Sequence, residues 1–150
     1  MRASILLFAL VPLLLHAAPA SAQSYQQVVA IQLDSATVMF ENSGFRSAPG
    51  VLRGESRGSL EDGGTFTIPM RLEAGTQYFF VGVCDQDCND LDLFLKDEKG
   101  AQLASDVELD DVPIVEFVPT RSGTYLLDVG MVSCDASICY YGVSAFQGGK

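Results

Sequence analysis

From residue 59 onward, apolar side chains alternate with polar ones over short segments that Gly, Asp and Pro separate. Such alternation is typical of β-strands with one buried face, because successive strand residues point to opposite faces of a sheet. The segment Tyr78–Cys84 is almost continuously apolar and predicts a central strand that is covered on both faces. Seven or so strands of this kind, at intervals of about 8–14 residues, predict an all-β antiparallel sandwich.

The region before these strands has a different pattern. Between residues 25 and 42, apolar side chains recur every three or four positions, although residues 29–33 also alternate as in a strand. The length of the segment favours a helix, and Gly44 is well placed to end it. Residues 44–58 are rich in Gly, Ser and Arg and are predicted to form a connecting loop.

The N-terminus has the features of a secretory signal peptide. Arg2 precedes an apolar run over residues 5–15, and Ala20-Ser21-Ala22 supplies the small residues that signal peptidase recognises. We expect cleavage after Ala22 and a mature protein in the periplasm or outside the cell. The predicted layout has three parts: a signal peptide (1–22), an N-terminal helix and linker (23–58), and a β-sandwich domain (59–150).

Composition limits the chemistry of the mature chain. A net charge of −10 argues against nucleic acid as a partner, since nucleic-acid binding needs a basic surface. The only histidine, His16, lies in the predicted signal peptide. The mature chain therefore lacks the base of a Ser-His or Cys-His nucleophile and any histidine ligand for zinc. We also expect no transmembrane segment, because no second apolar run approaches about 18 residues.

One sequence motif matches the pattern around the catalytic serine of many hydrolases. The letters GESRG over residues 54–58 fit the G-x-S-x-G pattern of a nucleophile elbow. That motif works on a strand-to-helix turn with a histidine base later in the chain, and neither condition is expected here. We therefore expect no catalytic residue and no enzymatic activity. A small hydrolase that uses carboxylates alone stays open as a further alternative.

The four cysteines form two close pairs, Cys84 with Cys88 and Cys134 with Cys139. In an exported chain such pairs predict disulfides rather than a zinc site. Long-range bridges would constrain the unfolded chain more, but each pair falls where a strand ends in a short loop. We favour the two local bridges, and neither pair has the C-x-x-C spacing of a redox site.

Acidic residues concentrate between residues 85 and 111, where ten carboxylates accompany two lysines. Most such acids serve as turn and capping residues in contact with solvent. The alternative is a calcium site, because Ca²⁺ prefers oxygen ligands. The first residues resemble an EF-hand loop, but Asp90 stands where that loop needs glycine and Lys96 where it needs glutamate. A calcium site of another kind would draw its ligands from Asp85, Asp87, Asn89, Asp90, Asp92, Asp110 and Asp111.

Several motifs follow one another in a recognisable order. They are DLDLFL (90–95), LASD (103–106), IVEFVP (114–119), SGTYLLDV (122–129) and YYGV (140–143). In this order they resemble the bacterial pre-peptidase C-terminal (PPC) domain over residues 59–146. The resemblance implies a small jelly-roll-like β-sandwich of the kind appended to secreted peptidases, although no peptidase is attached here. The chain would be a stand-alone exported member of the family.

Together these features predict an all-β, antiparallel, jelly-roll-like β-sandwich with a short N-terminal helix. The expected function is that of an exported, non-catalytic binding or accessory module of the cell envelope or medium. Its ligand would be a protein or a polysaccharide, and no cofactor is expected apart from the possible calcium ion. A calcium-dependent binding module is the alternative. The aromatic residues of the strands are expected to pack in the core.

Overall fold

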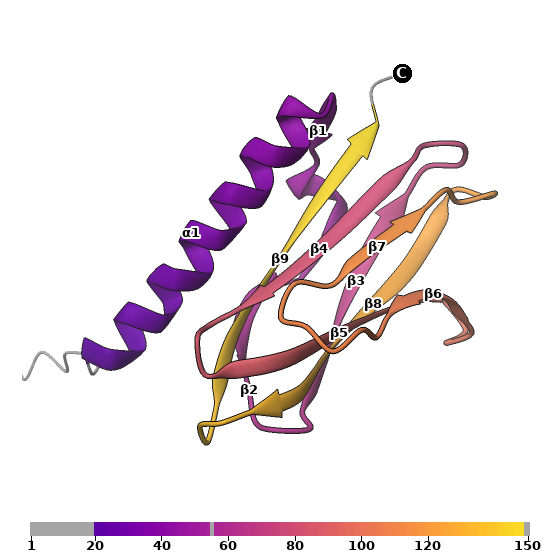
Figure 1. Cartoon of the computed structure of the whole chain (residues 1–150). Helices are drawn as coiled ribbons and strands as arrows, with labels where there is room; N and C mark the ends of the chain where they lie inside the picture. The colour runs from indigo at the N-terminus through magenta and orange to yellow at the C-terminus, as the bar shows by residue number, and fades with distance from the viewer. Residues whose placement is uncertain (1–19, 55, 149–150) are drawn as a thin grey trace, which may run out of the picture.

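The structure is a computed structural model that describes residues 20–54 and 56–148. Most of the predicted signal peptide, residues 1–19, lies outside the described residues. The described chain forms one α-helix, one 3-10 turn and nine strands, as Figure 1 shows. Their bounds are α1 Ala20–Asn42, β1 Phe45–Ser47, η1 Pro49–Val51, β2 Arg57–Leu60, β3 Thr65–Leu72, β4 Tyr78–Cys84, β5 Cys88–Asp97, β6 Gln102–Asp106, β7 Ile114–Phe117, β8 Gly123–Cys134 and β9 Cys139–Gly148.

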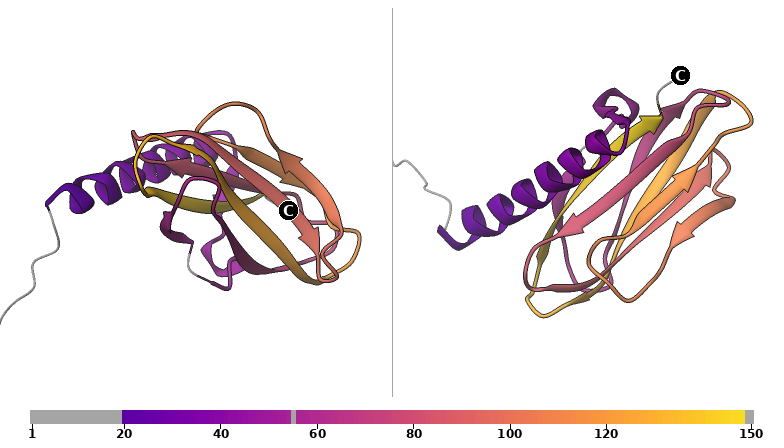
Figure 2. Two further views of the ribbon diagram at one scale, coloured as in Figure 1. Left: turned by 90° about the horizontal axis from the view of Figure 1, so that it is seen from below. Right: turned by 45° about the horizontal axis from the view of Figure 1, so that its top comes forward.

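The strands form two sheets that pack face to face (Figure 2). The first sheet has the order β2-β9-β4-β7, and β1 pairs with the other end of β9 on the same edge. The second sheet has the order β3-β8-β5-β6. Every pairing is antiparallel. This arrangement of eight strands in two four-stranded orders is that of a jelly roll, which confirms the predicted fold class.

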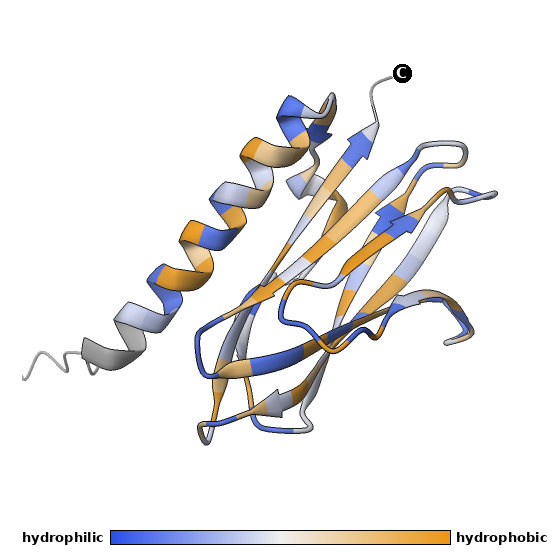
Figure 3. Cartoon of the chain, viewed as in Figure 1, coloured by the Kyte–Doolittle hydropathy of each residue, from blue (hydrophilic) through white to orange (hydrophobic). Residues whose placement is uncertain are grey.

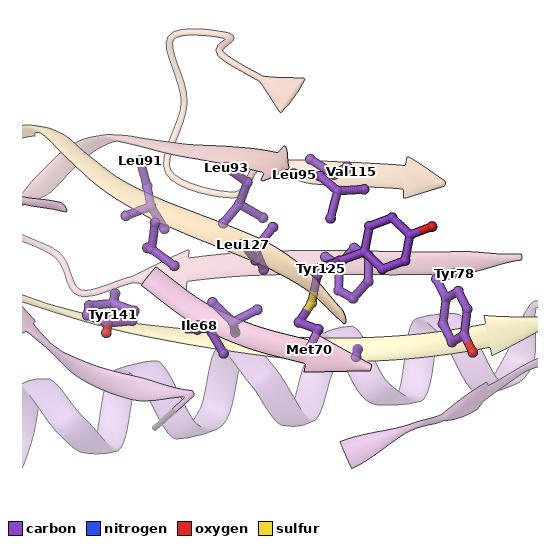
Figure 4. Close-up of a cluster of buried hydrophobic side chains, with 14 of the residues drawn as sticks. Ile68, Met70, Tyr78, Leu91, Leu93, Leu95, Val115, Tyr125, Leu127 and Tyr141 are labelled. Carbon is purple, nitrogen blue, oxygen red and sulfur yellow. The ribbon is translucent and has the colours of Figure 1, made fainter. Parts of the chain in front are cut away.

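The core between the sheets consists of the inward-facing residues of the alternating strands. Leu91, Leu93 and Leu95 of β5 are fully buried, and Leu127 and Val129 of β8 meet them. Figure 4 shows these leucines in the same buried cluster as Ile68 and Met70 of β3, which belongs to the same sheet, and Tyr78 and Tyr141 of the first sheet. The sequence register of β5 was therefore predicted correctly, because a shift of one residue would have exposed all three leucines.

Helix α1 covers the outer face of the first sheet (Figure 1). Four helical residues spaced three or four apart form its buried stripe: Val29, Leu33, Ala36 and Phe40. Phe40 stacks on Phe146 of β9, with ring centroids 4.4 Å apart. Figure 3 shows apolar residues separated by polar ones along the helix. Because of this cover, β4 is buried on both faces, which explains its continuous apolar sequence.

Close approach of the helix depends on Gly142 of β9. A Cβ atom at this position would lie 2.7 Å from Leu33 Cδ1 and 2.8 Å from Val29 Cγ1. The helix ends as the sequence indicates, with Gly44 at a φ of 89°. At its other end α1 extends back to Ala20, so the helix begins earlier than the predicted residue 25. None of the described helices is long and apolar enough to cross a membrane.

Residues 44–58 differ from the predicted connecting loop. This segment contains β1 and the start of β2, and both pair with β9 at the edge of the first sheet. These strands have three and four residues, which is too short for a period of two to appear in the sequence. The segment between the helix and residue 59 is therefore part of the sandwich.

Two disulfides join Cys84 to Cys88 and Cys134 to Cys139, and no described cysteine is free. Each bridge connects a strand of the first sheet to a strand of the second, at the loop where the chain crosses between them. Cys88 and Cys134 also face each other in the β5–β8 register, so both bridges lie at the same end of the sandwich. This is the local pairing that the sequence favours, and it fits an oxidising compartment.

Candidate functional site

The first predicted metal ligand, Asp85, is a structural residue. Its side chain is buried, and its carboxylate accepts hydrogen bonds from the backbone N–H of Asp87 at 3.1 Å and of Tyr140 at 2.7 Å. The backbone N–H of Asp85 also donates to the carbonyl of Tyr140 at 3.0 Å. Asp85 therefore holds the β4–β5 loop against β9, and both of its carboxylate oxygens are occupied.

A second group of acids lies at the start of β5 and in the loop between β6 and β7. The carboxylates of Asp106 and Asp110 accept hydrogen bonds from backbone N–H groups of their own loop. Asp90 is only 6% exposed, and its Oδ1 atom is buried without a hydrogen-bond partner. Leu91 N–H donates to the Asp110 carbonyl at 3.0 Å, which places this loop beside the start of β5.

The electrostatics of these acids follow from their burial and closeness. Loss of solvent raises the pKa of Asp90, and the nearby carboxylate of Asp110 raises it further. The pKa of Asp92 is raised by loss of solvent and then by Asp90 and Asp106. The unpartnered Oδ1 of ionised Asp90 is therefore costly to bury, and a cation or a proton would relieve that cost.

The predicted calcium ligands lie on the β4–β5 loop, at the start of β5 and on the β6–β7 loop. Asp85 and Asp87 belong to the β4–β5 loop, whereas Asp90 and Asp110 approach each other, and Asn89 is exposed. Among residues 20–54 and 56–148, no three acidic, cysteine or histidine side chains lie close enough to hold a metal ion as they stand.

A hollow of about 320 Å³ opens between α1 and the edge of the first sheet. Its lining consists of Gln26, Val29, Arg57, Gly58, Ser59, Tyr140 and Tyr141. The β2–β9 register pairs Arg57 with Gly142 and Ser59 with Tyr140. Because directly opposed residues of an antiparallel pair point to the same face, Arg57, Ser59 and Tyr140 all lie on the face that α1 covers. Cavities of this size lie at the lower end of the range for small-molecule sites.

Ring stacking and hydrogen bonds fix the position of Tyr140, which forms one wall of the hollow. Its ring stacks on that of Tyr25 of α1, with centroids 6.2 Å apart and planes inclined by 12°. The Tyr25 hydroxyl donates a hydrogen bond to Asp87, which raises the pKa of Tyr25 because ionisation would place two negative charges together. Asp85 fixes the Tyr140 backbone through the two hydrogen bonds described above. The hollow therefore has a positioned aromatic surface beside polar groups.

Tyr141 also lines the hollow, but its buried ring lies in the core between the sheets, beside Gly58. A Cβ atom on Gly58 would lie 3.1 Å from this ring, so a larger residue would displace it. Gly58 is the last residue of the hydrolase-like motif, and Ser56, two residues earlier, contributes a backbone carbonyl that accepts a hydrogen bond from Val143 N–H at 2.7 Å. The motif leads into β2 and not into a helix, as predicted.

None of the residues that line the hollow is predicted as a site from the sequence. Apolar periodicity predicts a loop at Arg57 and a core position for Tyr140, since it reveals neither short edge strands nor helix docking.

A scan against models of known protein families matches none, and no curated protein matches the sequence. The resemblance to the PPC domain therefore stays a prediction that rests on its motifs.

Proposed function

We propose that this chain is an exported, non-catalytic binding module that acts in the periplasm or outside the cell. The observation that carries the proposal is the hollow between α1 and the β2–β9 edge. It combines an aromatic wall, an amide, a hydroxyl and a guanidinium, which are the groups that fix a small ligand by contact and hydrogen bonding. The two disulfides and the signal-like N-terminus support export.

Membership of the PPC family would fit this proposal, because a β-sandwich module of that kind needs no catalytic group of its own. The absence of histidine after residue 22 supports a non-catalytic role, because the common nucleophile–base pairs need one.

A variant that fills the hollow tests the proposal. Ser59 is exposed and lines the hollow, so Ser59→Trp should occupy it without disturbing the core. Ser105→Trp is the matched control, because Ser105 is exposed on the edge strand β6 and far along the second sheet. The protein is immobilised and exposed to envelope and medium fractions of the producing cells. We expect Ser59→Trp to abolish capture of a ligand that wild type and Ser105→Trp both retain. Equal capture by both variants, or none by wild type, would contradict the proposal.

A calcium-dependent module is the second candidate, and the unpartnered buried Oδ1 of Asp90 favours it. A cation would bind Asp90 with Asp110 and draw Asp92 and Asp106 toward it. Binding to the folded state alone would raise stability by about 2.7 kcal/mol at a hundred times Kd, which is several degrees in Tm. A thermal melt in EDTA and in millimolar calcium should show this rise in wild type and not in Asp90→Asn. Magnesium should raise the Tm less than calcium does, because it loses its bound water molecules less readily. Equal midpoints in EDTA and calcium would exclude this candidate.

A further inference from the structure

The lining of the hollow differs in charge from the rest of the molecule. The chain has 19 acidic and 9 basic residues, yet none of the seven lining residues is acidic and one, Arg57, is a cation. In the part of the chain that the structure describes, the one ion pair joins Lys96 to Asp128. Arg57 therefore pairs with no described carboxylate. A ligand that enters this hollow meets one positive group, Arg57, beside a wall whose carboxylates, Asp85 and Asp87, already bond to Tyr140 and Tyr25, and this favours an anion.

The other side chains that line the hollow indicate which class of anion would bind best. The Tyr140 ring offers an apolar face, while the Gln26 amide and the Ser59 hydroxyl can donate and accept hydrogen bonds. A simple inorganic anion would use Arg57 and leave the aromatic wall without a partner. An apolar acid would use Arg57 and the wall and leave the amide and hydroxyl to water. A sugar ring with a carboxylate has one apolar face of C–H groups, several hydroxyls and one negative charge.

The arrangement of the groups fits such a ring. The side chain of Arg57 lies on β2 two residues from Ser59, and Ser59 is directly opposite Tyr140 in the β2–β9 register. Gln26 faces them from α1. The cation, the hydroxyl and the aromatic ring therefore follow one another along one face of the sheet edge. The volume of about 320 Å³ suits one ring or the end of a short chain rather than a long polymer segment.

We propose that the hollow binds an acidic saccharide through one uronate residue. The carboxylate pairs with the Arg57 guanidinium, the C–H face of the ring packs on Tyr140, and ring hydroxyls bond to Gln26 and Ser59. This inference rests on the proposed function and names the ligand class of the same site. The stacking of Tyr25 on Tyr140 positions the aromatic wall before the ligand arrives, which lowers the ordering cost of binding.

The test is calorimetric titration of the exported protein with two acidic probes and one neutral one. The acidic probes are tri-galacturonate and a mannuronate trimer, and the neutral probe is galactotriose. We expect at least one acidic trimer to bind about tenfold or more tightly than the neutral trimer. Arg57→Gln should remove this preference and weaken acidic-trimer binding about tenfold or more, and Arg57→Lys should restore part of it. Arg53→Gln is the matched control, because Arg53 is an exposed arginine four residues away that does not line the hollow.

The outcomes separate this inference from the proposed function. If Ser59→Trp abolishes ligand capture while Arg57→Gln and ligand charge have no effect, the hollow binds a ligand and the acidic-saccharide assignment is wrong. If Arg53→Gln weakens binding as much as Arg57→Gln, the charge acts from a distance and the assignment is again wrong. If no trimer binds and Ser59→Trp changes nothing, both the inference and the proposed function fail.

Discussion

The docking of α1 on the first sheet can be tested with two substitutions on one helix. Leu33 is 3% exposed and faces β9, whereas Ile31, two residues earlier, is 58% exposed. Leu33→Ala removes three apolar carbons, which at about 0.8 kcal/mol each gives a transfer loss of about 2.4 kcal/mol. The cavity that remains beside Gly142 adds to this loss, so we expect a total of about 2.5–4 kcal/mol. Ile31→Ala should change the free energy of unfolding by less than about 0.5 kcal/mol.

Urea denaturation measures both variants. With an m-value of about 2 kcal/mol per molar urea, Leu33→Ala should lower the midpoint by about 1–2 M, and Ile31→Ala should leave it unchanged. The m-value itself should stay constant if the helix unfolds together with the sandwich. A Leu33→Ala midpoint equal to that of wild type would refute the reasoning, because the helix would then contribute no buried contact and could not form a wall of the hollow.

Three further predictions concern the sandwich and its export. Leu93→Ala should cost about 2–5 kcal/mol in a denaturant melt, and a neutral result would mean that Leu93 is not in the core. In EDTA, the raised pKa of Asp90 should make the folded protein lose stability as the pH rises from the ordinary value of 3.8 through the raised one. Asp90→Asn should reduce that loss and leave the part that the raised pKa of Asp92 contributes, and an unchanged pH profile would show that Asp90 is not a source of the loss. The exported protein should begin at Gln23 and take up no alkylating reagent without reduction, whereas an intact Met1 or a free thiol would contradict export or the disulfides.

The alternating strands were predictable because each has one face on the core and one toward solvent. The leucines of β5 show this most clearly, since their period of two gave both the strand and its buried face. The cysteine pairs were also predictable, because each falls at a short loop between strands. In each case the feature depends on residues that are close in the sequence or on the regular alternation of apolar and polar residues.

The edge strands and the hollow were not predictable for the opposite reason. β2 is defined by its pairing with β9, and about eighty residues of sequence separate Ser59 from its partner Tyr140. The role of Asp85 as a hydrogen-bond acceptor for Tyr140 is likewise set by a contact across 55 positions. Local composition suggested a metal ligand at Asp85, because a buried carboxylate that caps backbone groups has the same sequence signature as an exposed one.

The most direct test of the binding site is a chemical-shift map of the isotope-labelled, exported protein titrated with an acidic trisaccharide. The proposed site predicts that shift changes concentrate at the amides of Gln26, Arg57, Ser59 and Tyr140 and are lost in Ser59→Trp. Shift changes at the acidic start of β5, or none at saturating ligand, would contradict the assignment of the hollow as the binding site.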